Sequence, residues 1–150
     1  MTFGKNSTLY GTTEYGGGGN FPSGTVFRLL SRPNGTWSEQ TLHSFEEGND
    51  GGEPSASVVL DEKGNIYGTA TGGGGAFRYG VLFRLEPGGG GGPWNLVPLY
   101  AFTGSPDGAH PAAPLVMDKA GNWYSTTQWG GTGTNCYGTG GCGTVFKASP

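Results

Sequence analysis

Short stretches in which apolar and polar residues alternate follow one another along the chain, separated by glycine-rich segments. Alternation with a period of two is typical of β-strands that bury one face. No stretch has the spacing of apolar residues that predicts an amphipathic helix, and glycine or proline interrupts most windows longer than about ten residues. The pattern therefore predicts an all-β protein built from short strands.

The pattern repeats with a period of 57 residues. Tyr10, Tyr67 and Tyr124 hold this spacing within an aromatic-Tyr-Gly/Ser-Thr motif. The same offset separates four further pairs: Trp37 and Trp94, Phe45 and Phe102, Pro54 and Pro111, and Asp61 and Asp118. Five landmarks at one spacing indicate a tandem repeat. We assign the repeated Trp and Tyr positions to packing between repeats.

One period contains four strand patterns. In the middle repeat they are Pro54–Asp61, 65–69, 80–85 and Trp94–Phe102. In the last strand Trp94, Leu96, Pro98 and Tyr100 face one way. Leu99 and Phe102 are taken as out of this phase, which a twisted or bulged outer strand would tolerate. Four short antiparallel strands in a period of this length are typical of a β-propeller blade, with a β-solenoid or a β-sandwich as the alternatives.

The chain covers about two and a half such blades in a single repeat domain, 1–150. We expect a partial blade with strands two to four at 1–52, a complete blade at 53–104, and a partial blade with strands one to three at 105–150. Propellers close with about four to eight blades, so we expect either a fragment of a longer protein or assembly with copies of itself. Exposed blade faces predict self-association.

Composition and charge narrow the classes of function. The chain has 33 Gly and 10 Pro, but its 4 Trp, 7 Tyr and 8 Phe argue against disorder. The net charge of −3, with no basic stripe, argues against nucleic-acid binding. No apolar run approaches the ~20 residues of a membrane span, and no stretch has the pattern of a signal peptide.

The residues that could bind a ligand lie mostly in the loops after the second and fourth strands. These loops share one face, because antiparallel strands alternate in direction; they cover residues 16–20, 46–53, 72–77, 104–110 and 130–141. We expect any binding site on this face. Asp50 and Asp107 recur once per repeat and would suit Ca²⁺ or sugar hydroxyls, or would simply build their turns. Ca²⁺ is the one cofactor that these residues leave open.

Four more residues complete the predicted binding set. Glu53 and His110 occupy equivalent positions, so a repeated catalytic role is disfavoured, and no catalytic residue is assigned. Tyr15 and Trp129, taken as non-repeated loop positions, are candidates for stacking on a sugar or a peptide.

The two cysteines, Cys136 and Cys142, lie in one loop. A local disulfide is the first interpretation, and it fits an oxidising, exported setting. A metal site would need two further ligands, and a reactive thiol pair would need a basic neighbour.

Several strings together resemble a known family. They are Thr-Leu-Tyr-Gly-Thr-Thr at 8–13, Gly-Thr-Val-Phe-Arg-Leu at 24–29, Leu-His-Ser-Phe at 42–45, Asp-Gly-Ala-His-Pro at 107–111 and Asp-Lys-Ala-Gly-Asn-Trp-Tyr at 118–124. The combination resembles the GloVer tandem repeat over almost the whole chain. Departures are Ser125 for Gly, Ala70 for Thr, and Val81-Leu82 for Thr-Val. The resemblance implies long bacterial proteins, often exported and sometimes surface-anchored, and brings no known activity.

Three functional hypotheses follow. The first is a non-catalytic module of an exported or cell-surface bacterial protein that acts as a binding scaffold for a glycan or a protein. The second is a propeller-type glycan lyase or hydrolase, which would need paired carboxylates near the axis. The third is a purely structural spacer.

Overall fold

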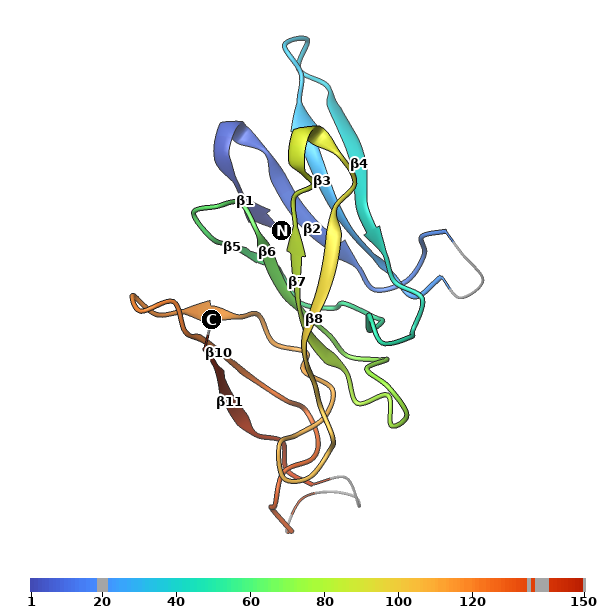
Figure 1. Ribbon diagram of the computed structural model, residues 1–150, viewed down its shortest axis with the longest axis vertical. Coiled ribbons are helices and arrows are strands. Elements are labelled where there is room, and N and C mark those ends of the chain that lie inside the picture. Colours follow the sequence, from blue (N-terminus) through green and yellow to red (C-terminus); the bar gives the residue numbers. More distant parts are fainter. Residues whose placement is uncertain (19–21, 135, 137–140, 150) are drawn as a thin grey trace.

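Three antiparallel β-sheets follow one another along the chain and pack side by side (Figure 1). The computed structural model describes residues 1–18, 22–134, 136 and 141–149; parts of two expected loops, 19–20 in one and 135 and 137–140 in the other, lie outside them. Within the described residues the protein is all-β, with only two short 3₁₀ turns, Lys5–Ser7 and Gly89–Gly91. None of its described helices is long or apolar enough to cross a membrane.

Each sheet is a meander in which strands that follow one another in sequence pair antiparallel. The first sheet contains β1 (Thr2–Phe3), β2 (Leu9–Thr13), β3 (Thr25–Ser31) and β4 (Trp37–Ser44). The second contains β5 (Val59–Leu60), β6 (Ile66–Ala70), β7 (Val81–Glu86) and β8 (Asn95–Ala101). The third contains β9 (Val116–Met117), β10 (Trp123–Thr126) and β11 (Val145–Ala148). These are blades of the propeller type, and the described residues do not close a ring.

The first strand of each sheet differs from the expectation. β5 covers two residues, not the whole of Pro54–Asp61. The carbonyl groups of Ala56 and Val58 accept hydrogen bonds from the hydroxyls of Thr12 (3.0 Å) and Thr2 in the first sheet. The chain there joins two sheets instead of extending one. β1 lies one repeat length before β5, so the first sheet has four strands where three were expected.

Of the two irregularities that the sequence left open for the last strand, the structure has a β-bulge, and it lies at Leu99. In the second sheet Leu82 pairs with Tyr100 and Phe83 pairs with Pro98, so Leu99 has no residue opposite it. The first sheet has the same shift one repeat earlier. An extra residue on the outer strand changes which side chains face inward, which explains the broken alternation.

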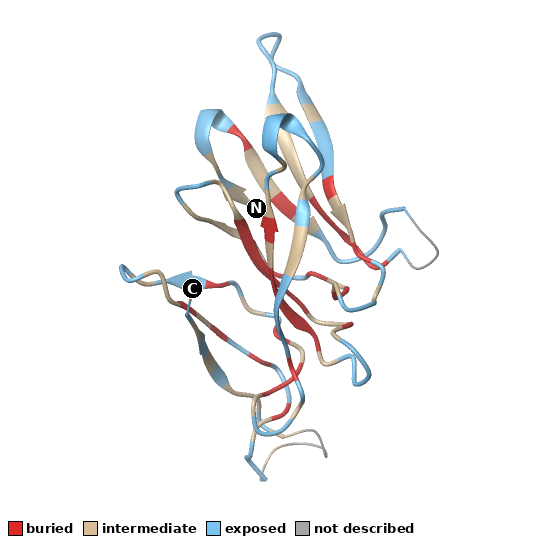
Figure 2. Cartoon of the chain, viewed as in Figure 1, coloured by how far each residue is buried: buried red, intermediate tan, exposed pale blue. Residues whose placement is uncertain are grey.

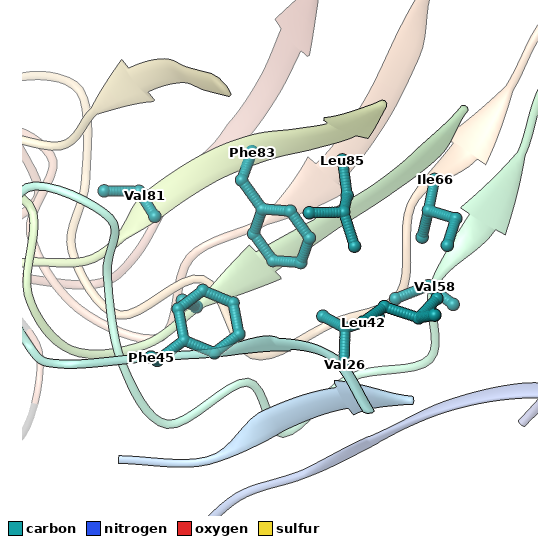
Figure 3. Packing of buried hydrophobic residues seen from close by; sticks show 9 residues of the cluster. Val26, Leu42, Phe45, Val58, Ile66, Val81, Phe83 and Leu85 are labelled. Carbon is teal, nitrogen blue, oxygen red and sulfur yellow. The ribbon is translucent and has the colours of Figure 1, made fainter. Parts of the chain in front are cut away.

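The hydrophobic core lies between neighbouring sheets (Figures 2 and 3). The larger cluster joins the first two sheets and contains Val26, Leu42, Phe45, Val58, Ile66, Ala70, Val81, Phe83 and Leu85. The rings of Phe45 and Phe83 meet edge to face, with centroids 5.3 Å apart. A smaller cluster of Tyr67, Leu82, Leu115 and Trp123 joins the second and third sheets. Each repeat therefore buries apolar surface mainly against its neighbour.

A proline marks the crossing from each sheet to the next. At the first crossing, the N–H of Glu53 donates to the carbonyl of Ser23 (2.7 Å), just before β3 of the first sheet. The carbonyl of Glu53 accepts from the hydroxyl of Thr71 (2.9 Å), just after β6 of the second sheet. Glu53 has a φ of 54°. Gly24 packs so closely here that a Cβ on it would lie 2.7 Å from Cδ of Pro54. We call this arrangement the proline joint.

The second proline joint has the same construction. The N–H of His110, whose φ is 53°, donates to the carbonyl of Tyr79 (2.8 Å), and its own carbonyl accepts from the N–H of Gln128 (3.0 Å). A Cβ on Gly80 would lie 2.7 Å from Cδ of Pro111 and 2.5 Å from the carbonyl oxygen of Ala70. Both joints thus require a glycine with no side chain facing the proline.

The repeated aromatic residues divide into two groups. Trp94 packs against the core of the first joint, and the ring of Tyr67 lies 4.4 Å from that of Trp123. Trp37 does not pack between sheets and is 48% exposed. Trp94 of the second repeat packs against the core that its sheet shares with the first sheet. The described residues place no sheet before the first one, against which Trp37 could pack in the same way. Trp37 therefore has no partner sheet among the described residues, and its role in packing between repeats stays a prediction.

The outward face of the third sheet is apolar and open. Val26 and Leu82, at equivalent positions in the first two sheets, are 0% and 1% exposed because the next sheet covers them; Val145 holds the same position in the third sheet and is 79% exposed. Self-association through such faces stays a prediction.

We predict that Gly80→Ala destabilises the protein by more than about 2 kcal/mol, because it combines a positive φ of 94° with contact against Pro111 and the Ala70 carbonyl. Urea denaturation measures this. Gly89→Ala is the matched control: a Cβ there meets no atom within 4 Å, and we expect a change within about 1 kcal/mol. Equal effects of the two substitutions would contradict the proline joint's dependence on glycine.

Two turns of sequence Asp-x-x-Gly-Asn, at 61–65 and 118–122, are held by the side chains of their aspartates. Asp118 accepts hydrogen bonds from the N–H of Ala120 (2.8 Å), from the N–H and side-chain amide of Asn122 (2.9 and 2.7 Å), and from the hydroxyl of Tyr124 (3.0 Å). These bonds, those from Asn122 first, lower the pKa of Asp118 to about 2. Asp61 makes the equivalent bonds one repeat earlier.

The lowered pKa predicts acid sensitivity. The charged Asp118 contributes its full stability above the pKa of an unfolded aspartate, about 3.9, and loses that contribution as the pH falls toward about 2. Asp118→Asn should therefore flatten the fall in unfolding free energy between pH 5 and pH 2, as measured by denaturant titration at each pH. The exposed neighbour Glu62→Gln serves as the charge-matched control. Parallel pH profiles for Asp118→Asn and the unmodified chain would refute this assignment.

Candidate functional site

The loops after the second and fourth strands meet, as expected from strand direction. Gly52 pairs with Gly72 in an antiparallel bridge, and Ala109 pairs with Trp129 in the same way one repeat later. In the second case each residue's N–H donates to the other's carbonyl, at 2.8 and 3.0 Å. The backbone that carries Trp129 is therefore held in place independently of its side chain.

A hollow of about 840 Å³ opens on this loop face beside the second proline joint. Its described lining consists of Tyr79, Thr103, Gly104, Ser105, Ala109, His110, Trp129, Gly130, Gly131, Thr132, Gly133, Thr134 and Gly141. Glycine backbone, hydroxyl groups and rings thus make up the surface. We call it the loop hollow.

His110 is oriented at the edge of the loop hollow. Its Nδ1 lies 2.9 Å from the carbonyl oxygen of Thr71. A carbonyl only accepts, so Nδ1 carries the proton and donates. In the neutral ring this leaves Nε2 as an acceptor.

Aromatic rings extend from this edge. The rings of Tyr79 and His110 meet edge to face at 6.1 Å, and Phe77 stacks on Tyr79 at 5.9 Å with an interplanar angle of 8°. Phe77 is 69% exposed and Trp129 is 39% exposed. Exposed rings beside a hollow offer flat apolar faces to a ligand. Phe77 and Tyr79 were not predicted as candidates, although two aromatic residues in a glycine-rich loop were a visible signal.

Tyr15 and Trp129 are equivalent residues, contrary to the expectation that they lie at non-repeated positions. They stand two repeat lengths apart, with Gly72 at the position between them. Tyr15 is 65% exposed, and it is not among the residues that line the loop hollow with Trp129. The nearby carboxylates of Glu14 and then Glu53 raise the pKa of Tyr15.

Asp50 is engaged by its own loop. Its carboxylate accepts from the N–H groups of Glu46 and Gly48, both at 3.1 Å, and lies 3.1 Å from Nε2 of His43. Burial raises the pKa of Asp50, but the hydrogen bonds, led by that of His43, outweigh it and hold the pKa below its usual value.

Asp107 repeats this role with different partners. It accepts from the hydroxyl of Tyr100 (2.7 Å) and from the N–H and hydroxyl of Thr103 (3.0 and 2.6 Å). Burial raises the pKa of Asp107. The hydrogen bonds from Thr103 and Tyr100 have the larger effect, so the pKa lies below its usual value. Asp107 lines a different cavity from His110, so Asp50, Asp107 and His110 do not converge on one pocket.

Among the described residues no group of three or more His, Cys, Asp or Glu side chains is arranged to hold a metal ion. Cys136 and Cys142 form a disulfide with Cα atoms 5.3 Å apart. Residues 137–140 between them lie outside the described part of the chain.

These features define a class: an all-β repeat protein whose units are antiparallel blades of three or four described strands, joined through prolines and carrying loops on one face. The family model described as the Gloeobacter/Verrucomicrobia repeat matches residues 1–150. The chain therefore belongs to this family, which confirms the resemblance noted in its sequence. No curated protein and no solved structure matches the chain.

The contacts of Asp107 predict a turn-building role. Asp107→Ala removes three hydrogen bonds and should lower the unfolding free energy by about 1–3 kcal/mol, to the same extent in Ca²⁺ and in EDTA. Thermal unfolding in the two buffers provides the measurement, with Asp107→Asn as a milder variant that keeps one acceptor oxygen. A loss of stability seen only in Ca²⁺ would instead identify a cation ligand.

Proposed function

We propose that this chain is a non-catalytic module of an exported bacterial protein and that its loop hollow binds a glycan. The observation that carries the proposal is the combination of an exposed indole, Trp129, with a hollow of about 840 Å³ at the second proline joint. A rigid scaffold with a site on its loops is a common way to present binding residues.

The chemistry of the lining supports a neutral sugar. Its described residues offer hydroxyls at Thr103, Ser105 and Thr132, exposed glycine backbone, and rings, and none is Asp, Glu, Lys or Arg. Sugars present both hydroxyl groups and apolar C–H faces, so this mixture of polar groups and flat rings suits them. Nε2 of His110 adds an acceptor for a sugar hydroxyl.

Two observations support the other parts of the proposal. The engagement of Asp50 and Asp107 by their own loops favours binding over hydrolysis, which would need two free carboxylates flanking one bond. The disulfide between Cys136 and Cys142 suits an oxidising compartment outside the cytoplasm.

The test is a glycan array probed in Ca²⁺ and in EDTA, followed by calorimetry on the best neutral ligand. We expect binding in both buffers, and at least about a tenfold loss of affinity in Trp129→Ala, equivalent to about 1.4 kcal/mol. Trp37→Ala is the matched control, because Trp37 is 48% exposed but begins β4 at the end away from the loops. The absence of any neutral ligand, or equal affinities for the two variants, would favour a spacer.

A further inference from the structure

The row of aromatic rings that begins in the loop hollow continues outside it. Tyr79 lines the hollow, and its ring meets that of His110 edge to face at 6.1 Å. Phe77, two residues before Tyr79, lies outside the lining and is 69% exposed. Its ring is stacked on that of Tyr79, with centroids 5.9 Å apart. The three rings therefore lead from the hollow to an exposed flat face.

The middle ring of this row is held by backbone from the next repeat. The carbonyl of Tyr79 accepts from the N–H of His110 (2.8 Å). A Cβ on Gly104 would lie 2.8 Å from Cε2 of Tyr79, so the backbone of the next loop packs directly on the ring. The carbonyl of Gly104 in turn accepts from the N–H of Gly131 (2.7 Å). Tyr79 is therefore a fixed base on which the ring of Phe77 rests.

The loop that carries Phe77 is also tied to the preceding repeat. The guanidinium of Arg78 forms an ion pair with the carboxylate of Glu47, and the N–H of Gly74 donates to the carbonyl of Gly48 (2.9 Å). Arg78 and Glu47 both have left-handed backbone, with φ of 56° and 59°, a conformation that is uncommon for residues other than glycine. The surrounding structure must hold such a conformation in place. Contacts with two repeats thus fix the position from which Phe77 meets solvent.

Packing within the protein does not account for the exposure of Phe77. A buried phenylalanine stabilises a fold through its apolar area, and Phe77 leaves most of that area in water. A ring that is fixed before binding loses little conformational freedom when a ligand stacks on it. The charge of the adjacent Arg78 is balanced by Glu47, which favours a neutral ligand over an acidic one.

We propose that Phe77 is a second stacking subsite, and that the ligand is a linear, neutral, β-linked glycan of the glucose or xylose type that extends from Trp129 to Phe77. The hydroxyl groups of these sugars lie near the plane of the ring, so both faces expose C–H groups that stack on aromatic rings. A linear chain repeats these faces and can use two rings at once. Arg78 is a positioning residue that acts through the loop. This inference rests on the proposed glycan binding and adds the length and linkage of the ligand.

Calorimetry on the full chain with cellobiose, cellohexaose, xylobiose and xylohexaose tests the proposal. We expect at least one hexasaccharide to bind about tenfold more tightly than its disaccharide, because only the longer chain reaches both rings. Phe77→Ala should weaken hexasaccharide binding by about three- to tenfold and leave the disaccharide affinity unchanged. Phe77→Tyr should keep the hexasaccharide affinity, and Trp129→Ala should weaken binding of both lengths. Thermal unfolding checks that each variant is folded.

Phe3→Ala is the matched control for an exposed phenylalanine. Phe3 is 78% exposed and pairs with Leu9 at the start of β2, at the end away from the loops, so the affinities should not change.

Three further variants test the positioning role of Arg78. Arg78→Gln and Glu47→Gln each break the ion pair from one side, and they should cause the same partial loss of hexasaccharide affinity. Arg78→Lys keeps the charge pair and should restore the affinity. A loss in Arg78→Gln without one in Glu47→Gln would overturn the positioning role, because it would show direct contact of Arg78 with the ligand.

Three results would overturn the proposed subsite. Equal hexasaccharide affinities for Phe77→Ala and the unmodified chain would remove it, and binding that still depended on Trp129 would leave the proposed function intact. If neither hexasaccharide bound while the glycan array identified another neutral ligand, the length and linkage proposed here would be wrong but glycan binding would stand. If the array showed no neutral ligand, glycan binding itself would fail, and the subsite with it.

Discussion

At each proline joint, backbone from one sheet must come within contact distance of the ring of the next repeat's proline. Gly24 and Gly80 permit this approach because a Cβ at either position would overlap the proline. The residue before that proline then bonds to both sheets through its backbone, with a side chain that differs between repeats: Glu53 at one joint, His110 at the other. The cores between the sheets depend on this spacing, since it sets how closely the apolar faces meet.

The parts of the structure that depend on local chemistry could be predicted from the sequence. The 57-residue period, the Asp118 turn and the bulge at Leu99 all involve residues near one another in the chain, where spacing and side-chain type carry the information. The short first strands could not be predicted in this way. Just before β5, the carbonyl groups of Val58 and Ala56 accept hydrogen bonds from Thr2 and Thr12 of another sheet, and such partners leave no periodic trace within the segment itself.

For the candidate site, the sequence predicted only the face of the protein on which it lies. Strand direction placed the correct loops together, and His110 and Trp129 do line one hollow. The sequence did not separate them from Asp107, which lines another cavity although it lies three residues from His110. Nor did it indicate the neighbouring rings of Phe77 and Tyr79, because their relation to His110 arises at the joint between two sheets. Residues at a joint take their roles from two repeats at once.

The proline joints also have a mechanical consequence. The chain passes from one sheet to the next once per repeat, so tension applied along the chain loads the joints in series, and each can open without unravelling the others. One opened repeat of 57 residues releases roughly 190 Å of extended chain, at about 3.3 Å per residue. A surface protein built from many such units would lengthen in discrete steps under shear, while the repeats still folded kept their loops available.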